Sequence, residues 1–344
     1  MWNELITAAT LLLFLTTIIY KAHIVNNGYQ LFTKEYSTVL KGICCIIVVL
    51  VHIPAEHSTR IQNSIGSFAY VAVTLFFLLS GYGLNVSRKK NGYLDTFWRR
   101  RIPSLVIPMV SVNVLSVLVN IICKSDVSVI ETLFTINGFT LMLGLCYLAY
   151  YFTYNNKGLN DNTKRVLVSV FIIAISIGTY TCETVIPFTV WPVPCLGFMY
   201  GVIIADYKDK IISNLNNYKF LDMQTFFLLA FAILIGGGYI KTKNILFFGD
   251  YIIRALLAVI LILLLVKITS KVKLGNKILY VLGSISYEIY LSHGITMRLL
   301  DFLYPELISG LYISITLVGT IFIALCLHGV DNVLISRAKK VLIN

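Results

Sequence analysis

Long apolar segments, separated by short polar connections, constrain this chain more than any other feature. Each is long enough to form an α-helix that crosses a hydrocarbon core about 30 Å thick. Charged residues make up only 13% of the chain and hydrophobic residues 58%, whereas a soluble domain carries about 25% charged residues. The sequence therefore predicts an all-α, polytopic transmembrane helix bundle of about eleven spans. The expected spans are approximately 4–20, 37–54, 65–86, 102–123, 130–153, 165–182, 187–205, 222–240, 247–266, 277–297 and 308–335.

The basic residues alternate between the connections and thereby predict the orientation. Of 28 lysines and arginines, 22 lie in alternate connections or the C-terminal tail, and one, Arg254, lies within a segment. The five on the opposite side are Arg60, Lys124, Lys241, Lys243 and Arg298. By the positive-inside rule, the N-terminus lies outside and the C-terminus in the cytoplasm. Topology explains the net charge of +12, so we expect membrane lipids and no nucleic acid as partners.

The first expected helix is a retained span rather than a signal peptide. The segment Leu5 to Tyr20 follows Met-Trp-Asn-Glu, without a basic region before it or a small-residue cleavage site after it.

An apolar run from Lys41 to His52 combines two ionisable residues on one expected helix. Eleven residues rise by about 16 Å, roughly half of a hydrocarbon core. An ionisable side chain at that depth is costly and suggests a functional site. Two interpretations of His52 remain: a histidine at a helix end before Pro54, or a general base that takes a proton from a hydroxyl.

Two further motifs lie close together in the sequence. Bulky aromatic residues precede Ser80 and Gly81, a small-residue pair that serves either helix packing or the close approach of a ligand. The next connection contains Arg88-Lys89-Lys90 and Arg99-Arg100-Arg101, followed by Pro103. These cations indicate either ordinary cytoplasmic charge and lipid contact or a phosphate clamp, for which the arginine fork is well suited.

A fourth motif runs from Ser286 to His293 and places Glu288 near mid-membrane. A buried glutamate forms either a helix-packing hydrogen bond or part of a polar cavity, and the sequence favours the cavity. Arg254 is a possible partner for Glu288. His328 is expected to be structural.

Other residues have simpler interpretations. His23 and His57 are expected to be solvated loop residues, and Trp191 an interfacial anchor. Gly197 and Gly201 form a close-packing face. The seven cysteines have no metal-binding spacing, so no metal site is expected, although Cys182 and Cys195 could pair.

Taken in order, these four motifs resemble the acyltransferase 3 family of bacterial membrane proteins. The resemblance rests on Lys41 and His52, Phe76 to Gly81, Arg99 to Pro103, and Ser286 to His293. It covers residues 36–335 as the membrane domain. Residues 1–35 form an additional N-terminal helix and loop, and residues 336–344 a short basic tail.

The resemblance implies roles for individual residues. His52 would be the catalytic histidine, which deprotonates the acceptor hydroxyl or relays the acyl group, supported by Glu288 and His293. Lys41 and the arginines 99–101 would hold the phosphates of acetyl-CoA, with Ser80 and Gly81 along the donor path. Here a lysine stands where the family more often has arginine, and Ser104 stands where a second arginine is expected.

Together with the predicted topology, the resemblance implies a bacterial plasma-membrane O-acyltransferase. It would move an acetyl or other short acyl group from cytoplasmic acetyl-CoA to a hydroxyl of a cell-surface polysaccharide or lipid-linked saccharide. One alternative is a transporter or flippase with Glu288, Arg254 and His293 as its proton or substrate path. Another is a membrane sensing module, although no soluble enzyme domain accompanies it.

Overall fold

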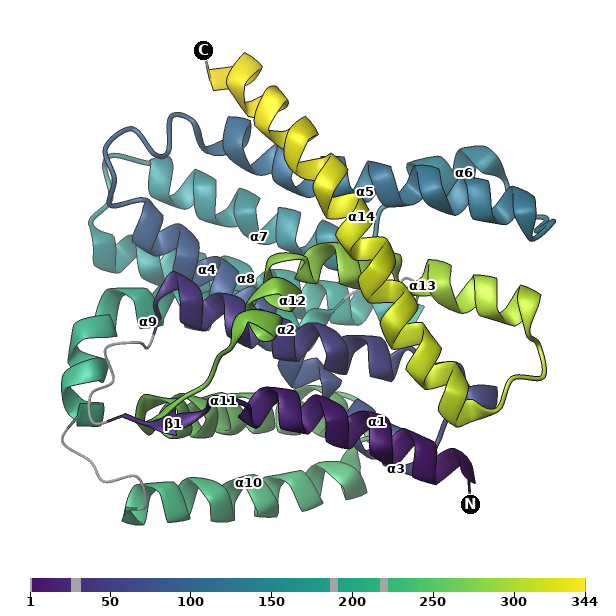
Figure 1. Ribbon diagram of the computed structural model, residues 1–344. Coiled ribbons are helices and arrows are strands. Elements are labelled where there is room, and N and C mark those ends of the chain that lie inside the picture. The colour runs from purple at the N-terminus through teal and green to yellow at the C-terminus, as the bar shows by residue number, and fades with distance from the viewer. Residues whose placement is uncertain (1, 26–31, 186–190, 217–221, 344) are drawn as a thin grey trace.

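The computed structural model describes residues 2–25, 32–185, 191–216 and 222–343 as a bundle of helices (Figure 1). The helices are α1 (Trp2–Ile19), α2 (Lys34–Val51), α3 (Arg60–Gly66), α4 (Ala69–Ser87), α5 (Phe97–Ile122), α6 (Val129–Phe134), α7 (Gly138–Asn155), α8 (Asp161–Val185), α9 (Pro192–Asn216), α10 (Met223–Thr242), α11 (Arg254–Lys271), α12 (Lys277–Ser284), α13 (Ser286–Leu303) and α14 (Ser309–Ile343). The shorter elements are a 3₁₀ turn η2 (Ala55–His57), a π-helix η3 (Phe248–Ile253) and the antiparallel strands β1 (His23–Ile24) and β2 (Val272–Lys273). The prediction of an all-α bundle is confirmed.

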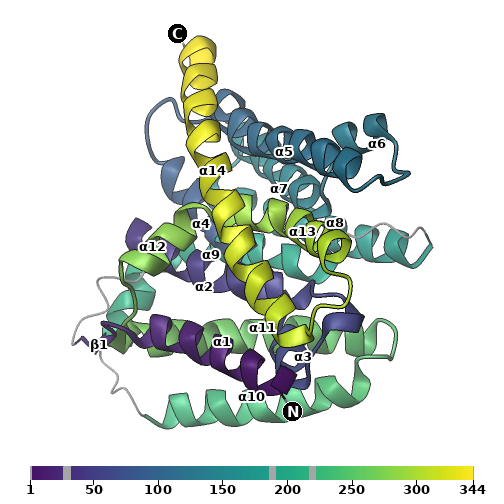
Figure 2. The ribbon, with the colours of Figure 1, turned by 45° about the vertical axis from the view of Figure 1, so that its right-hand side comes forward.

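The helices are arranged around α2, which packs against α4, α12 and α13. Helices α5 and α7 lie on one side of this centre, and α1, α10 and α11 lie on the other (Figures 1 and 2). Helix α14 crosses the bundle obliquely, and its C-terminal end projects beyond the neighbouring helices (Figure 2). We call the two ends of the bundle the Lys41 end and the His52 end, after the residues of α2 that lie toward them.

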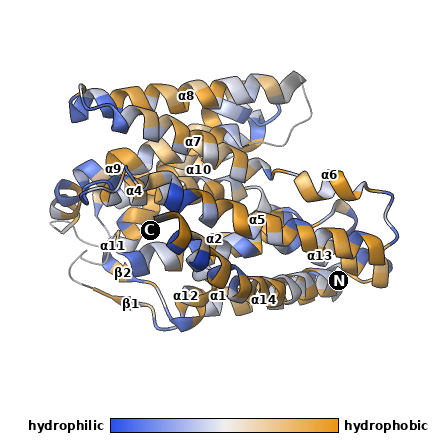
Figure 3. Cartoon of the chain, turned by 90° about the horizontal axis from the view of Figure 1, so that it is seen from above, coloured by the Kyte–Doolittle hydropathy of each residue, from blue (hydrophilic) through white to orange (hydrophobic). Residues whose placement is uncertain are grey.

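The outside of the bundle is apolar, as a lipid environment requires. In α5 the exposed side chains recur every four residues at Val106, Val110, Val114 and Leu118, which form one stripe along the helix. Hydrophobic residues cover most of the length of the helices, whereas hydrophilic residues gather toward the helix ends (Figure 3). An apolar surface of this extent fits a multi-pass membrane protein.

Helices α4 and α9 pack unusually closely because glycines remove side chains from their interface. A Cβ atom added at Gly197 would lie 2.2 Å from the Thr74 carbonyl oxygen, and one at Gly201 would lie 2.0 Å from the Leu78 carbonyl oxygen. Real Cβ atoms do not approach other atoms this closely, so any residue larger than glycine would push the two helices apart. The prediction that these glycines form a close-packing face is confirmed.

Three predicted spans, 65–86, 130–153 and 277–297, are each divided between two helices. Residues 130–153 contain the end of α6 and the start of α7, and Asn137 caps α7 by accepting a hydrogen bond from the Phe139 amide at 2.9 Å. The carbonyls of Leu133 and Thr135 at this break accept hydrogen bonds from the Asn113 side chain. The break between α12 and α13 falls at Ile285. Hydropathy does not detect such breaks. The one between α6 and α7 is tolerated within an apolar segment because the Asn113 side chain of α5 satisfies its freed carbonyls.

Eight helical segments in the described part of the chain are long and apolar enough to cross a membrane. Helices α2, α9 and α13 are not among them, because their windows contain too many charged or polar residues. The total of eleven spans therefore stays a prediction. Two of these three helices, α2 and α13, carry the candidate functional residues and are shielded from lipid by their neighbours.

Candidate active site

Helix α2 ends at His52 because the next two residues are Ile53 and Pro54. A proline disfavours the helical conformation of the residue before it, here Ile53. The last helical residue is therefore Val51, and His52 is the C-cap. Its ring Nδ1 lies 2.7 Å from the Val48 carbonyl oxygen. A carbonyl only accepts, so Nδ1 carries the proton and donates it in this bond. The Nε2 of the neutral ring is then the basic nitrogen.

A second histidine lies beside the first. The rings of His52 and His293 have centroids 4.5 Å apart. The Nδ1 of His293 donates to the Tyr290 carbonyl oxygen at 2.6 Å, so this ring also keeps Nε2 as its basic nitrogen. Trp191 completes one wall, with its ring 6.2 Å from that of His52 and its Nε1 donating to the Tyr290 hydroxyl at 3.2 Å. Two imidazoles in an aromatic enclosure are suited to accept and pass on a proton.

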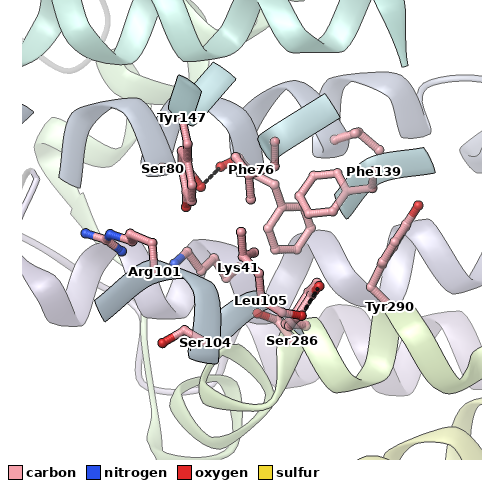
Figure 4. Close-up of a pocket in the computed structure, with 13 residues that line it drawn as sticks. Lys41, Phe76, Ser80, Arg101, Ser104, Leu105, Phe139, Tyr147, Ser286 and Tyr290 are labelled. Carbon is pink, nitrogen blue, oxygen red and sulfur yellow. Dashed lines mark hydrogen bonds between the residues drawn. The ribbon is translucent and has the colours of Figure 1, made fainter. Parts of the chain in front are cut away.

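A cavity of about 200 Å³ is lined at one end by Tyr290, whose ring centroid lies 5.9 Å from that of His293. Lys41 and Arg101 lie toward one end of it and Tyr290 toward the other, with Phe76 and Phe139 between them (Figure 4). The cavity is smaller than a typical ligand pocket of about 300–1,000 Å³ and has mainly apolar walls. It is therefore shaped for a slender chain with a charged group at one end.

The charged end of the cavity is formed by two cations, Lys41 and Arg101, whose like charges repel each other. Arg101 donates a hydrogen bond to the Tyr93 hydroxyl, and its guanidinium lies 5.8 Å from the centroid of the Tyr147 ring. Among the described residues, its buried Nε has no hydrogen-bond partner. Two cations and an unused donor suit a phosphate group. Lys339 of α14 is within electrostatic range of Arg101 and adds a third cation nearby.

The three consecutive arginines do not act as a unit. All three lie in the first turns of α5 rather than in the preceding connection, so the predicted start of this span at residue 102 is too late. Arg99 and Arg100 are exposed, and only Arg101 lines the cavity. Successive residues of a helix are rotated by about 100° around its axis, so three successive side chains cannot face one cavity.

Ser80 and Gly81 also separate. Ser80 lines the cavity, and its hydroxyl donates to the Phe76 carbonyl oxygen at 2.8 Å (Figure 4). Gly81 faces α9 instead, because a Cβ atom there would lie 2.2 Å from the Phe198 carbonyl oxygen. The prediction that Gly81 lines the donor path is corrected: this glycine allows α4 and α9 to approach.

Glu288 does not join the histidine pair. Its Oε1 accepts a hydrogen bond from His328 Nδ1 at 2.7 Å, which ties α13 to α14. The expectation of a cavity-lining role is therefore wrong, and the helix-packing interpretation holds. Arg254 is not its partner either, because the Arg254 guanidinium lies 4.7 Å from the centroid of the Tyr70 ring. The structural role expected of His328 stays a prediction, with which the bond between α13 and α14 agrees.

Two smaller predictions are also corrected. His57 is buried rather than solvated, with its ring stacked 3.8 Å from that of Tyr312. Trp191 is part of the site rather than only an interfacial anchor. The pairing left open between Cys182 and Cys195 does not occur, because both are free, one exposed and the other buried.

Sequence reasoning missed the aromatic residues that shape the site. Tyr93 lies in the connection before α5. Phe139 and Tyr147 lie on α7, which carried no motif. Their positions depend on how α5 and α7 pack against α2. The clustering of tyrosines in α7, at 147, 150, 151 and 154, was the one available signal.

The fold and the site together define a multi-pass, all-α membrane protein with a buried histidine pair and a cationic cavity. A family model described as an acyltransferase domain, that of the acyltransferase 3 family, matches residues 34–329. The chain belongs to this family and is a membrane acyltransferase. Searches of curated proteins and of solved structures found no match to the chain.

Proposed function

We propose that this acyltransferase moves an acetyl or other short acyl group from acetyl-CoA at the cytoplasmic face to a hydroxyl on the outer side. The acceptor is a cell-surface polysaccharide or a lipid-linked glycan, and the membrane is the bacterial plasma membrane. The observation that carries the proposal is the cavity that is lined by Lys41 and Arg101 at one end and by Tyr290, the neighbour of the His52 and His293 pair, at the other.

The donor is held through its phosphates at the cationic end. Lys41 and Arg101 neutralise phosphate charge, and the arginine fork adds directional hydrogen bonds. The cavity is too small for the nucleotide, so the nucleotide stays at the mouth and the slender pantetheine arm enters between Phe76 and Phe139. The length of this arm matches the separation of about 16 Å between Lys41 and His52 along the helix.

The transfer step uses the basic nitrogen of His52. Its Nε2 takes the proton of the acceptor hydroxyl while the oxygen bonds to the thioester carbonyl carbon. The carbon–sulfur bond then breaks, its electron pair leaves with sulfur, and the imidazolium returns the proton to give the free thiol. The His293 ring, with its own Nε2 basic, holds the second hydrogen-bonding position beside the reacting group.

Tyr290 stands between the cavity and the histidines. It lines the cavity, contacts Phe139 at 5.0 Å between ring centroids, and is held by Trp191. A movement of this side chain is needed for the thioester to reach His52. Such a barrier keeps water from the thioester until the donor is bound.

The transporter alternative loses its supporting arrangement. Glu288 is bonded to His328, and Arg254 lies over Tyr70 and lines a cavity other than that of Lys41. The residues invoked as its path therefore do not meet.

The test compares His52→Ala with a matched control, His23→Ala, in a transfer assay with labelled acetyl-CoA. His23 is exposed and distant in sequence from all four motifs. Loss of a general base lowers kcat by about 10²–10⁴-fold, so we expect that loss for His52→Ala and none for His23→Ala. Equal insertion and melting temperature of the two variants exclude misfolding, and full activity of His52→Ala would refute the assignment.

A further inference from the structure

The His52 end of the bundle contains a second site, separate from the histidine pair. It is a polar cavity between α3, α10 and the start of α11, lined by Ser64, Ser67, Lys243 and Arg254. Lys243 and Arg254 are two of the few basic residues away from the predicted cytoplasmic side. Among the described residues, no carboxylate lies within 4.0 Å of either cation. Asp250, one turn before Arg254, is bonded to the Tyr180 hydroxyl instead.

An unused donor marks this cavity as a place for an anion. The Nε of Arg254, which lines the cavity, is buried without a hydrogen-bond partner in the described chain, as is the hydroxyl of the neighbouring Tyr70. The Tyr70 side chain is only 2% exposed and lies beneath the Arg254 guanidinium. A buried donor without a partner is destabilising by about 1–3 kcal/mol, so a ligand that accepts these hydrogen bonds is stabilised.

Two apolar grooves run from the same place into the membrane. One lies between α2, α4 and α11 and shares Ser64 and Phe68 with the polar cavity. The other lies between α10 and α11 and shares Phe68 and Ile240 with it. The two grooves have similar volumes, about 560 and 520 Å³, and meet at Phe68 and Leu261.

The length and direction of the grooves fit one leaflet of a bilayer. The second groove follows α10 from Ile240 to Leu229, and eleven residues span about 16 Å, half of a hydrocarbon core. With the predicted orientation, the cationic cavity lies at the outer headgroup level and the grooves point toward mid-membrane.

We propose that this site binds an anionic, two-chain phospholipid of the outer leaflet. Lys243 and Arg254 hold the phosphate, Tyr70 supports the Arg254 guanidinium from below, and each groove takes one acyl chain. A single-chain polyprenyl phosphate would leave one groove unfilled, and free phosphate would leave both unfilled.

The cationic half of the site is tested with the purified full-length protein in detergent. Binding of dioleoyl phosphatidylglycerol is measured by native mass spectrometry, with dioleoyl phosphatidylcholine for comparison. We expect tighter binding of the anionic lipid. Lys243→Gln and Arg254→Gln should each weaken binding of the anionic lipid by about fivefold, which is the change in affinity expected for the loss of one cation near an anionic headgroup. Lys124→Gln, an exposed cation at the same predicted face, has no effect. Equal binding of both lipids, unchanged by either substitution, would overturn the proposal.

The apolar half is tested by two glycines of α10. A Cβ at either Gly237 or Gly238 meets open space, but only Gly237 lines the groove. We therefore expect Gly237→Phe to weaken phosphatidylglycerol binding and Gly238→Phe to leave it unchanged. Equal effects of the two variants would contradict the groove assignment.

Two further probes identify the ligand class. Undecaprenyl phosphate that binds more tightly than phosphatidylglycerol would overturn the two-chain assignment. Inorganic phosphate that raises the melting temperature as much as the phospholipid would show that the grooves bind nothing. Neither result affects the acyl-transfer proposal, because the site shares no residue with the Lys41 cavity.

Discussion

Arg101 gives the sharpest test of how the donor is held, because its two neighbours in the sequence are matched controls. Arg99, Arg100 and Arg101 have the same charge and the same helix, but only Arg101 lines the cavity. A hydrogen bond to a charged group contributes about 1.5–3 kcal/mol, whereas an exposed ion pair contributes about 0–1 kcal/mol.

These magnitudes predict a clear separation between the variants. At 1.4 kcal/mol for each factor of ten, Arg101→Ala raises the KM for acetyl-CoA by about 10–150-fold. Arg99→Ala and Arg100→Ala raise it by less than about fivefold. Because the interaction is with the donor, the KM for the acceptor changes little in all three variants.

The assay is the initial rate of acyl transfer at varied acetyl-CoA concentration, with the protein in detergent or in nanodiscs. Arg101 also bonds to Tyr93, so the melting temperature of each variant separates a local effect from misfolding. Arg101→Lys keeps the charge but loses the fork and should lie between wild type and Arg101→Ala. Equal effects of Arg99→Ala and Arg101→Ala would refute the reasoning, since the cluster would then act as general cytoplasmic charge.

Two further predictions concern residues outside the reacting groups. Glu288→Gln should keep acyl transfer within about threefold of wild type, because Glu288 is bonded to His328 rather than placed in the cavity; a loss of 10²-fold or more at an unchanged melting temperature would show a catalytic role. Asp222 affects stability in a pH-dependent way. Although partial burial raises the pKa of its carboxyl, hydrogen bonds from Lys267 and the first turn of α10 lower it by more, so the pKa is below its ordinary value. The stabilisation is therefore present above the unfolded pKa of about 3.9 and lost as the pH falls through the folded value. Asp222→Asn should lower the melting temperature at pH 7 and by less near pH 3, and an equal decrease at both pH values would contradict this.

The sequence was most informative where a residue's role depends on its depth in the membrane. Lys41 and His52 lie on one helix, so their separation follows from helical rise alone, and the apolar segments follow from hydropathy. The alternation of basic residues predicts an orientation without any knowledge of packing.

Packing between helices decided what the sequence left open. The sequence suggested Arg254 as a partner for Glu288, and the actual partner, His328, depends on where α14 crosses α13. Ser80 and Gly81 are adjacent in sequence, but their faces on α4 differ, and the neighbour on each face determines the role. His52 and His293 are 241 positions apart in the chain, and no local pattern predicts that their rings meet.

The central claim is that the donor enters at the Lys41 end and that transfer takes place toward the His52 end. Sealed vesicles with one protein orientation test it directly, with labelled acetyl-CoA supplied on a single side and the acceptor on the other. We expect labelled acceptor only when acetyl-CoA is on the side that carries the C-terminal tail. Product formed equally with acetyl-CoA on either side, or only with acetyl-CoA on the side of the N-terminus, would contradict this account.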